Sequence, residues 1–472
     1  MVDFDIIIVG AGTGGTTAAR FAAQKGLDVC LIDSKPREKI GDKICGDAVG
    51  TEAFELLKID PPKAGVDLSC HIKGAKLYSP NLQKCINLID PKQAGYVVDR
   101  LKFGQRLLNE ALDKGVKQFL DKTRALDLIY KEGIVTGLKV KAKNGEQAEL
   151  KSKIVIDASG FYSPLRKKVK NPMIEKEIPN YDSILCYREI INFPNKDQEV
   201  QDPEYITIIL DPEKAPGGYI WYFPKNDSSI NLGLGVYMDY RGKVKDFYKK
   251  YAFDEFVKTT NIKIESSGGG VVPVRRPLWS CADNGLMLIG DAGCHVNPLH
   301  GGGIDPSMRA GFYAANTAAD AIESGNYTLE KLWDFNYNVM TTFGAEFAAL
   351  DLLRMVLQVL TNEDLNFGLE KDLLTAGEIL EIASTGSITL SLFDMAKKAI
   401  QGLSNPKLLL DLNYLRIRMN EIAKHYRKFP RTIHGFAEWK NNTIQIYEKI
   451  TNMIVKVKKN EKENIKGSEA HG

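Results

Sequence analysis

Apolar and polar positions near the start of the chain predict a β-α-β unit. A short apolar run at 6–9 precedes a stretch with helical spacing, and a second apolar run ends at Asp33. Short uninterrupted apolar runs are typical of strands buried in a parallel sheet. The apolar residues of 100–114 recur with the period of an amphipathic helix, and Asp99 before them is a suitable N-cap.

The pattern changes twice further along the chain. Short β-like runs alternate with turns from 180 to 278, residues 286–322 return to strand, glycine-rich loop and helix, and a mostly helical pattern begins near 328. The sequence therefore predicts an α/β (α+β) fold, with a Rossmann-like nucleotide-binding domain, an inserted β-sheet substrate domain and a helical C-terminal region. The expected boundaries are 1–178 with 279–327, 179–278 and 328–455 for these three parts, and 456–472 for a charged, disordered tail.

The composition excludes several classes of protein. Of the 472 residues, 44% are apolar and 26% charged, which is ordinary for a globular protein, and a net charge of +3 does not suggest a nucleic-acid partner. No run approaches the roughly 18 apolar residues that span a bilayer, and Asp3 and Asp5 argue against a signal peptide. Seven scattered cysteines without a C-x-x-C pair favour reduced thiols in a cytoplasmic protein and argue against a metal site.

A glycine motif lies between the first apolar run and the first helix. Gly10-x-Gly12-x-x-Gly15 permits a tight turn and lets backbone N–H groups approach a pyrophosphate at the helix N-terminus. Asp33, at the end of the second run, is placed to accept hydrogen bonds from ribose hydroxyls. These residues predict a dinucleotide site. The structural alternative is a glycine-rich turn in another kind of α/β protein.

Two later segments favour FAD as the dinucleotide. An apolar run at 286–289 ends in Gly290-Asp291, and Asp291 is placed to bond a ribityl hydroxyl, which FAD has and NAD lacks. The three glycines of 301–303 allow backbone contact with a flat ring, and Asp305 and Pro306 fit the N-cap and N1 positions of the next helix. That helix N-terminus would stabilise negative charge on a reduced flavin. Each segment alone is also compatible with a structural turn.

Two further features bear on the cofactor and its reductant. Arg100 is a candidate partner of the FAD pyrophosphate, although an arginine at a helix start is more often solvated, and the segment 157–166 either closes over the cofactor or forms a structural turn. A second glycine fingerprint for NAD(P)H is missing from the sequence. The reductant is therefore expected to bind transiently, or to be a protein or small electron carrier.

Three motifs together resemble one family. They are Lys43-Ile-Cys45-Gly46-Asp47-Ala48, then Gly218-Tyr219-Ile-Trp221-Tyr-Phe223-Pro224 followed by Gly233-x-Gly235, and the segment 297–304 with its glycine run. Over residues 3 to 435 the chain resembles the archaeal geranylgeranyl reductases, within the p-hydroxybenzoate-hydroxylase-like FAD superfamily. The resemblance implies FAD as cofactor and hydride transfer from reduced FAD to isolated C=C bonds of geranylgeranyl chains in archaeal membrane-lipid precursors. These precursors are digeranylgeranylglyceryl phospholipids, geranylgeranyl diphosphate or both.

The resemblance also implies site residues. The expected FAD contacts are Gly15, Asp33, Cys45, Gly46, Ala48, Arg100, Ala125, Asp291, Gly303 and Ile304. The expected prenyl site contains Tyr219, Trp221, Phe223, Gly233 and Gly235. Because alternate residues of a strand share a face, the three aromatic side chains are predicted to line one surface together. The alternative is an ordinary core strand filled with aromatics.

Cys45 and His300 are the candidate catalytic residues. A thiol beside the reacting face is a plausible proton source or substrate gate, and His300 is a second titratable group near the flavin loop. Against these roles, a buried Cys is more often a small hydrophobe, and such a His more often bonds backbone. Arg275-Arg276 is a candidate pair of cations for a phosphate headgroup, or else a solvated edge.

The expected partners are a prenyl lipid and an external electron donor, which is reduced ferredoxin, another carrier or NAD(P)H. Peripheral contact of the lysine-rich tail with the inner face of the membrane is a further hypothesis. Two other functions stay open at this point. One is an FAD-dependent monooxygenase of aromatic or isoprenoid substrates, and the other is an isoprenoid-binding carrier that uses FAD structurally.

Overall fold

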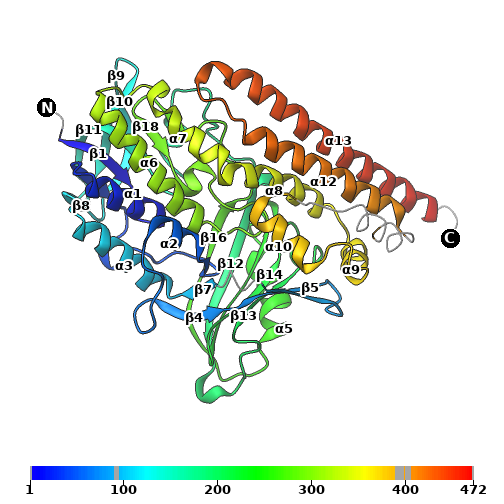
Figure 1. Ribbon diagram of the computed structural model, residues 1–472. Coiled ribbons are helices and arrows are strands. Elements are labelled where there is room, and N and C mark those ends of the chain that lie inside the picture. Colours follow the sequence, from blue (N-terminus) through cyan, green and yellow to red (C-terminus); the bar gives the residue numbers. More distant parts are fainter. Residues whose placement is uncertain (1–2, 90–94, 388–397, 399–404, 470–472) are drawn as a thin grey trace.

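Two large β-sheets and a small third one form the framework of the protein (Figure 1). The computed structural model describes residues 3–89, 95–387, 398 and 405–469. The first large sheet has eight strands and the second has seven. Helices from the N-terminal and C-terminal parts of the chain cover them, which confirms the predicted α/β class.

The first sheet is the predicted nucleotide-binding sheet. Its central strand β1 lies between two parallel neighbours, β11 and β2, and Ile6, Ile7 and Ile8 of β1 are completely buried. The full order is β17-β18-β11-β1-β2-β8, and β10 and β9 continue from β11 as an antiparallel ribbon. The bounds are β1 (Phe4–Val9), β2 (Val29–Ile32), β8 (Gln118–Leu120), β9 (Arg124–Lys131), β10 (Ile134–Lys141), β11 (Gln147–Asp157), β17 (Ala282–Asp283) and β18 (Leu286–Leu288).

Helices α1 (Thr13–Gln24) and α6 (Ile304–Ser324) pack closely beside this sheet (Figure 1). A Cβ on Gly311 of α6 would lie 2.4 Å from the carbonyl oxygen of Gly14 in α1, so only glycine permits this approach. Helix α3 (Arg100–Asp113) contacts α1, and the side chain of its N-cap Asp99 accepts a hydrogen bond from the Lys102 N–H, as predicted. The glycine loops before α1 and α6 are thereby brought together.

The second large sheet, in the order β16-β12-β15-β14-β13-β5-β6, is the predicted substrate sheet. It is not made from the expected insertion alone. Strands β5 (Gly74–Tyr78) and β6 (Cys85–Ile89) come from the preceding part of the chain, and β5 pairs in parallel with β13. The remaining strands are β12 (Ser183–Asn192), β13 (Tyr205–Ile209), β14 (Ile220–Asn226), β15 (Ser229–Tyr237) and β16 (Lys263–Pro273).

A small sheet and a short helix pack beside the large sheets. Strands β3 (Ala48–Gly50), β7 (Gly95–Val98) and β4 (Leu68–Ile72) form the small sheet, and α2 (Glu52–Leu57) follows β3. Phe54, Val98 and Phe103 share a hydrophobic cluster with Ile304 and Met308 at the start of α6. This cluster fixes the segment around Cys45 relative to the loop that precedes α6.

The C-terminal helices pack on the nucleotide-binding part rather than apart from it. One hydrophobic core runs continuously from β1 to Trp333, Tyr426 and Trp439. Figure 1 shows α12 (Pro406–Tyr426) and α13 (Phe436–Glu469) side by side along one edge of the molecule. Helix α13 continues through Glu469, whereas the sequence predicted a disordered tail from 456; lysine and glutamate, frequent in this segment, are good helix formers. The remaining helices are α4 (Val244–Tyr248), α5 (Asp254–Phe256), α7 (Leu329–Thr341), α8 (Phe343–Leu357), α9 (Asn362–Glu370), α10 (Ala376–Thr385), α12 (Pro406–Tyr426) and α13 (Phe436–Glu469).

Candidate active site

The first glycine loop has the geometry of a phosphate-binding turn. Gly10 has φ of +100°, and a Cβ there would lie 2.4 Å from the Ala158 carbonyl oxygen. A Cβ on Gly15 would lie 1.8 Å from the Gly10 carbonyl oxygen. Gly12, the N-cap of α1, faces open space and offers no side-chain cap. The N-terminus of α1 is therefore free to receive a pyrophosphate.

Asp33 lies directly beside this loop. Its Oδ2 accepts from the Ala11 N–H at 2.7 Å, and its Oδ1 accepts from the Lys35 N–H at 2.8 Å. The Asp33 carbonyl also accepts from the Thr123 N–H, which brings the start of β9, with the predicted contact Ala125, to the same edge of the sheet. Asp33, the Gly10 loop and the start of β9 therefore lie close together, and the role of Asp33 and Ala125 as FAD contacts stays a prediction.

Arg100 supplies the sharpest test of fit for an anionic cofactor. The side chain is 7% exposed, and its Nε and Nη1 atoms have no hydrogen-bond partner within the described chain. A buried guanidinium without an acceptor is costly, so such a group marks the place of an absent anion. The pyrophosphate of FAD would supply such an acceptor.

The second and third loops of the predicted flavin site also meet. Asp291 is 6% exposed, and its Oδ2 accepts from Lys43 Nζ at 2.9 Å. A Cβ on Gly303 would lie 3.5 Å from Asp291 Oδ1, so Asp291 faces the glycine run before Ile304. Lys43, Asp291 and Gly303 come from three separate segments and lie together, and two of them, Asp291 and Gly303, are predicted FAD contacts.

The prediction for Asp305 and Pro306 is wrong in position. Helix α6 begins at Ile304 with Gly303 as its N-cap, so Asp305 lies inside the first turn. Its carboxylate lies 3.6 Å from Arg309 and does not cap the helix. The glycine run forms the turn before the helix without a capping side chain. The helix therefore begins at Ile304, earlier in the chain than the predicted start at Pro306.

The segment around Cys45 is fixed on one face of the substrate sheet. Asn231 Nδ2 donates to the Cys45 carbonyl at 2.8 Å and to Asp47 Oδ2 at 3.0 Å. Lys225 Nζ donates to the same Asp47 oxygen at 3.0 Å and to the Val98 carbonyl at 2.5 Å. Asp47 is completely buried and has φ of +65°, a strained value for a residue with a side chain. The network holds Cys45, Gly46 and Ala48 in one conformation.

Asp47, Lys225 and Asn231 were not predicted to be functional from the sequence. Two signals were available. Asp47 directly follows the Cys45-Gly46 pair, and Asn231 shares strand alternation with Gly233 and Gly235. Neither signal predicts that a lysine and an asparagine from one hairpin meet an aspartate 178 and 184 residues away in sequence.

The predicted aromatic face is present. The rings of Tyr219 and Trp221 have centroids 6.1 Å apart, and those of Trp221 and Phe223 lie 6.4 Å apart. The indole Nε1 of Trp221 donates to Asn231 Oδ1 at 3.0 Å, so this face carries the Cys45 network as well.

Glycines make room for these rings. A Cβ on Gly233 would lie 2.3 Å from the Trp221 ring, and a Cβ on Gly46 would lie 2.7 Å from the Phe223 ring. Gly235 is the next residue of β15 on the same face as Gly233. A Cβ on Gly235 would contact the side chains of Ile184 and Cys186. The close approach of the Cys45 segment to the aromatic face therefore depends on residues without side chains.

His300 and Tyr219 join the flavin loop to the aromatic face. The Tyr219 hydroxyl donates to the His300 carbonyl at 2.6 Å, and burial together with Cys186 and Cys45 raises the Tyr219 pKa. His300 is exposed as a residue, and desolvation of its ring by the surrounding protein lowers its pKa to about 4. Its Nδ1 accepts from the Gly302 N–H at 3.1 Å, so a neutral ring carries its proton on Nε2.

The structure corrects the predicted headgroup role of Arg275 and Arg276. Both guanidiniums are buried and pair with Glu175, at 2.6 and 3.0 Å. Burial by itself would raise the pKa of Glu175. The charges of Arg276 and Arg275 outweigh this effect and lower the pKa to about 2. Arg275 also lies 3.4 Å from Asp182. These cations are neutralised within the fold and are not available to a phosphate.

Asp157 and Arg166 have structural roles as well. Ser159 and Ser163 donate hydroxyl hydrogen bonds to the buried Asp157 carboxylate. Arg166, 2% exposed, donates to the carbonyls of Ala292 and Phe161. The segment is a braced turn that supports the Gly10 loop.

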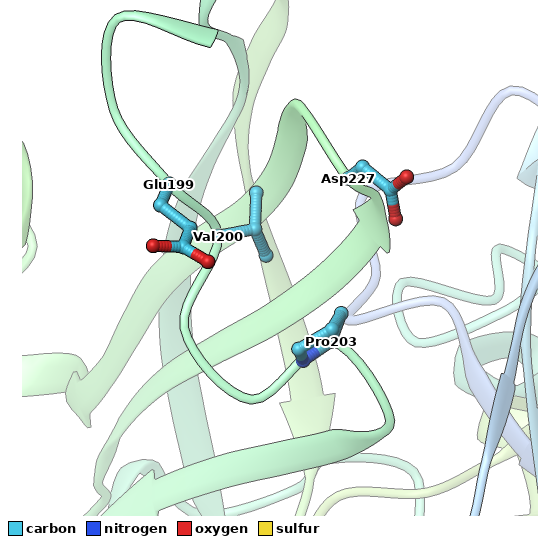
Figure 2. A pocket seen from close by; sticks show the side chains of 4 residues that line it. All are labelled: Glu199, Val200, Pro203 and Asp227. Atoms are coloured by element: carbon cyan, nitrogen blue, oxygen red, sulfur yellow. The ribbon is translucent and has the colours of Figure 1, made fainter.

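A separate pocket of about 410 Å³ lies at the far end of the substrate sheet, near the β14–β15 turn. Figure 2 shows its lining residues Glu199, Val200, Pro203 and Asp227. Asp227 follows the end of β14, whereas Tyr219 precedes its beginning. The pocket is therefore not part of the site built around Tyr219.

Two family models match the chain. Residues 5–161 match the FAD dependent oxidoreductase family, and residues 182–272 match the geranylgeranyl reductase catalytic domain. The first match covers Gly10, Asp33 and Arg100, and the second covers the aromatic face. In the described parts of the chain, every helix is too short or too polar to cross a membrane.

Two relatives match most of the chain. The chain is 36% identical over 441 residues to a digeranylgeranylglycerophospholipid reductase of Sulfolobus acidocaldarius, covering 93% of this chain and 96% of the relative. It is 33% identical to the enzyme of that name from Methanosarcina acetivorans, covering 90% and 98%.

Solved structures extend the comparison. A geranylgeranyl bacteriochlorophyll reductase-like protein of Thermoplasma acidophilum matches with a TM-score of 0.73 and 26% identity, over 87% of this chain and 99% of the other. The myxobacterial chondrochloren halogenase, a FAD-dependent halogenase, matches with a TM-score of 0.61 at 16% identity over 90% of this chain and 96% of the other, and shares only the fold. The chain is an FAD-dependent oxidoreductase that belongs to the digeranylgeranylglycerophospholipid reductase family.

Proposed function

We propose that the protein uses FAD to saturate isolated C=C bonds of geranylgeranyl chains in membrane-lipid precursors. The observation that carries this proposal is the meeting of the predicted flavin contacts with the aromatic face. Asn231 bonds both the Cys45 carbonyl and Trp221, and Tyr219 bonds the His300 carbonyl. An apolar, rigid surface beside a flavin suits a long hydrocarbon chain. The names of the relatives and the catalytic-domain match support the same substrate class.

Reduced FAD, when bound, supplies the hydride for one carbon of the double bond. An isolated alkene has no carbonyl to take up negative charge, so a proton must reach the other carbon before the hydride arrives or almost together with it. The protein therefore has to fix the alkene in place. Tyr219, Trp221 and Phe223 bind and orient the chain and exclude water. Orientation of this kind lowers the activation free energy by up to about 7–11 kcal/mol.

Cys45 and His300 are the proposed catalytic residues. The Cys45 carbonyl is held by Asn231, which fixes the backbone that carries the thiol. The thiol is our candidate for the proton source at the alkene. At neutral pH the His300 ring is neutral. We therefore propose that its Nε2–H donates a hydrogen bond in the site, and that the ring does not store the proton that is delivered to the alkene.

Electrons reach the flavin from an external donor. We propose reduced ferredoxin, another carrier or NAD(P)H for this role, with the donor binding transiently. Because the substrate is a lipid, the proposal includes peripheral contact with the inner face of the membrane.

Anaerobic incubation of dithionite-reduced holoprotein with geranylgeranyl lipids tests the proposal. Mass spectrometry should show a gain of two hydrogens per reduced bond, and the flavin should be reoxidised in the same stoichiometry. Oxygen-dependent formation of a hydroxylated product would instead favour a monooxygenase. A flavin that stays reduced with every prenyl substrate would remove the proposal.

A further inference from the structure

Arg188 is a buried cation on the same face of the substrate sheet as the aromatic residues. In the register of the sheet it lies opposite Gly233 of β15 and Gly268 of β16, and Gly233 in turn lies opposite Trp221. A Cβ on Gly233 would lie 2.7 Å from the Arg188 Cβ, which confirms that the Arg188 side chain lies on the Trp221 side of the sheet.

The guanidinium of Arg188 is only partly satisfied. The residue is 3% exposed, and Nη1 donates to the Ser266 carbonyl at 3.2 Å and to the Ser266 hydroxyl at 2.5 Å. The Nε atom is buried and has no partner in the described part of the chain. Neither Ser266 atom carries a negative charge.

The other deeply buried arginines have carboxylate or carbonyl partners. Arg275 and Arg276 pair with Glu175, and Arg354 pairs with Asp351 and Asp182. Arg166 fills its donors with carbonyl oxygens of its own chain.

Two buried guanidiniums lack a carboxylate and keep an unpaired Nε among the described residues: Arg100 and Arg188. Arg100 belongs to the pyrophosphate side of the cofactor. A buried cation without a counter-charge is unfavourable, so Arg188 also calls for an anion.

The position of Arg188 indicates which anion. Ser266, its partner, is exposed and belongs to β16, the edge strand of the sheet. The guanidinium therefore lies where the aromatic face reaches the sheet edge. A ligand that follows this face from His300 and Tyr219 would end beside Arg188 and Ser266.

We propose that Arg188, with the Ser266 hydroxyl, binds the phosphate or diphosphate group at the end of the prenyl substrate. The inference rests on the proposed function and adds a headgroup subsite to it. A guanidinium matches phosphate oxygens with paired N–H donors, and Nε is the donor still free. The subsite holds the charged end at the sheet edge and places the hydrocarbon along Trp221.

Paired substrates test the subsite. Reduced holoenzyme is given geranylgeranyl diphosphate or the uncharged alcohol geranylgeraniol, and kcat/KM is measured for both. In Arg188→Met, the preference for the diphosphate over the alcohol should fall roughly 10- to 100-fold, the range of a lost charge-assisted bond, with the alcohol nearly unchanged. Arg188→Lys keeps the charge and should retain part of the preference. Arg241→Met, at an exposed position of the same domain, should retain all of it.

The outcomes separate the two proposals. If the wild-type protein reduces neither of these substrates nor a digeranylgeranylglyceryl phospholipid, the proposed function fails. If it reduces both and the preference survives in Arg188→Met, or both rates fall equally in folded, flavin-loaded protein, the subsite is overturned. If Arg188→Met does not fold, the same comparison is made with Ser266→Ala and Arg188→Lys. Inorganic pyrophosphate is tested as a competitor of the alcohol. Inhibition in the wild type that is lost in Arg188→Met would support the subsite and show that a free anion also enters it. If pyrophosphate does not inhibit, binding at the subsite depends on the attached lipid chain.

Discussion

The side-chain amide of Asn231 donates a hydrogen bond to the backbone carbonyl of Cys45 at 2.8 Å. This bond joins a strand of the substrate sheet to the segment predicted to contact the flavin. The same amide accepts from Trp221 Nε1 and donates to the buried Asp47 carboxylate. A single residue thus connects the aromatic face with the conformation of the Cys45 segment, and the two halves of the site are not mechanically independent.

Replacing Asn231 with Leu should weaken both halves together. The Cys45 carbonyl and Trp221 Nε1 each lose their partner, which costs about 1–3 kcal/mol for each unsatisfied group, whereas Asp47 keeps its bond from Lys225. We expect a lower free energy of unfolding, a lower flavin content and slower flavin reoxidation by substrate. Urea unfolding and flavin absorbance measure these effects. Asn226→Ala, at the exposed last residue of β14 in the same hairpin, is the matched control. An Asn231→Leu protein with unchanged flavin binding and reoxidation would contradict the coupling.

Replacing Arg100 with Met should weaken FAD binding. The variant removes the buried guanidinium that lacks a partner in the described chain, and a charge-assisted bond is worth about 1.5–3 kcal/mol, or roughly 10- to 100-fold in Kd. Titration of the deflavinated protein with FAD gives the Kd. Lys102→Met alters an exposed cation of the same helix and should leave the Kd unchanged. Equal affinities of the wild type and Arg100→Met would assign the pyrophosphate to other groups.

Replacing Gly233 with Ala should disturb the substrate side selectively. The added Cβ would lie 2.3 Å from the Trp221 ring, and overpacking of this kind costs about 1–3 kcal/mol. We expect a lower kcat/KM for prenyl substrates with nearly normal FAD affinity. Gly242→Ala adds a Cβ where no atom lies within 4 Å and serves as the control. Loss of FAD without loss of substrate turnover in the loaded protein would count against an aromatic substrate face.

Replacing Cys45 with Ala tests the proposed proton source. A positioned acid typically contributes at least about 100-fold, so rapid mixing should show flavin reoxidation by the alkene slowed by this order. The Cys85→Ala variant, at a cysteine outside the Cys45 network, should react normally. If Cys45→Ala reoxidises at the wild-type rate, Cys45 has no part in the chemical step.

The pH dependence of stability should include a contribution from Glu346. Burial raises the Glu346 pKa from 4.5 to about 7. The nearby carboxylates of Glu52 and Asp305 add to this rise, and Arg309 opposes it. Between these values the folded protein binds more protons than the unfolded chain. The free energy of unfolding therefore falls as the pH rises from about 4.5 to 7. Because the side chain is only partly buried, we expect a loss of about 1–2 kcal/mol.

Urea unfolding at pH 5 and pH 8 measures this contribution. Glu346→Gln should lose less stability than the wild type over this interval, because its amide does not ionise. Glu363→Gln, at an exposed position, should follow the wild type. Identical pH profiles of the wild type and Glu346→Gln would show that Glu346 ionises normally in the folded state.

The local chemistry of the site follows from the sequence. The β-α-β unit, the turn at Gly10 and the helix capped by Asp99 depend on hydrophobic period, glycine conformation and capping, which act between near neighbours. The alternation of Tyr219, Trp221 and Phe223 likewise fixes their common side of a strand. These features were predicted because each depends on a short segment.

Tertiary structure alone decided the long-range pairings. The sequence offered Arg275 and Arg276 as headgroup cations or a solvated edge, but folding brings Glu175 beside them, whereas Arg100 and Arg188 have no carboxylate partner among the described residues. Which cation finds a counter-charge depends on contacts between segments about a hundred or more residues apart, for which the chain carries no local signal. Strand β5 joins the substrate sheet for the same reason, since an edge pairs with whichever strand the packed core brings to it.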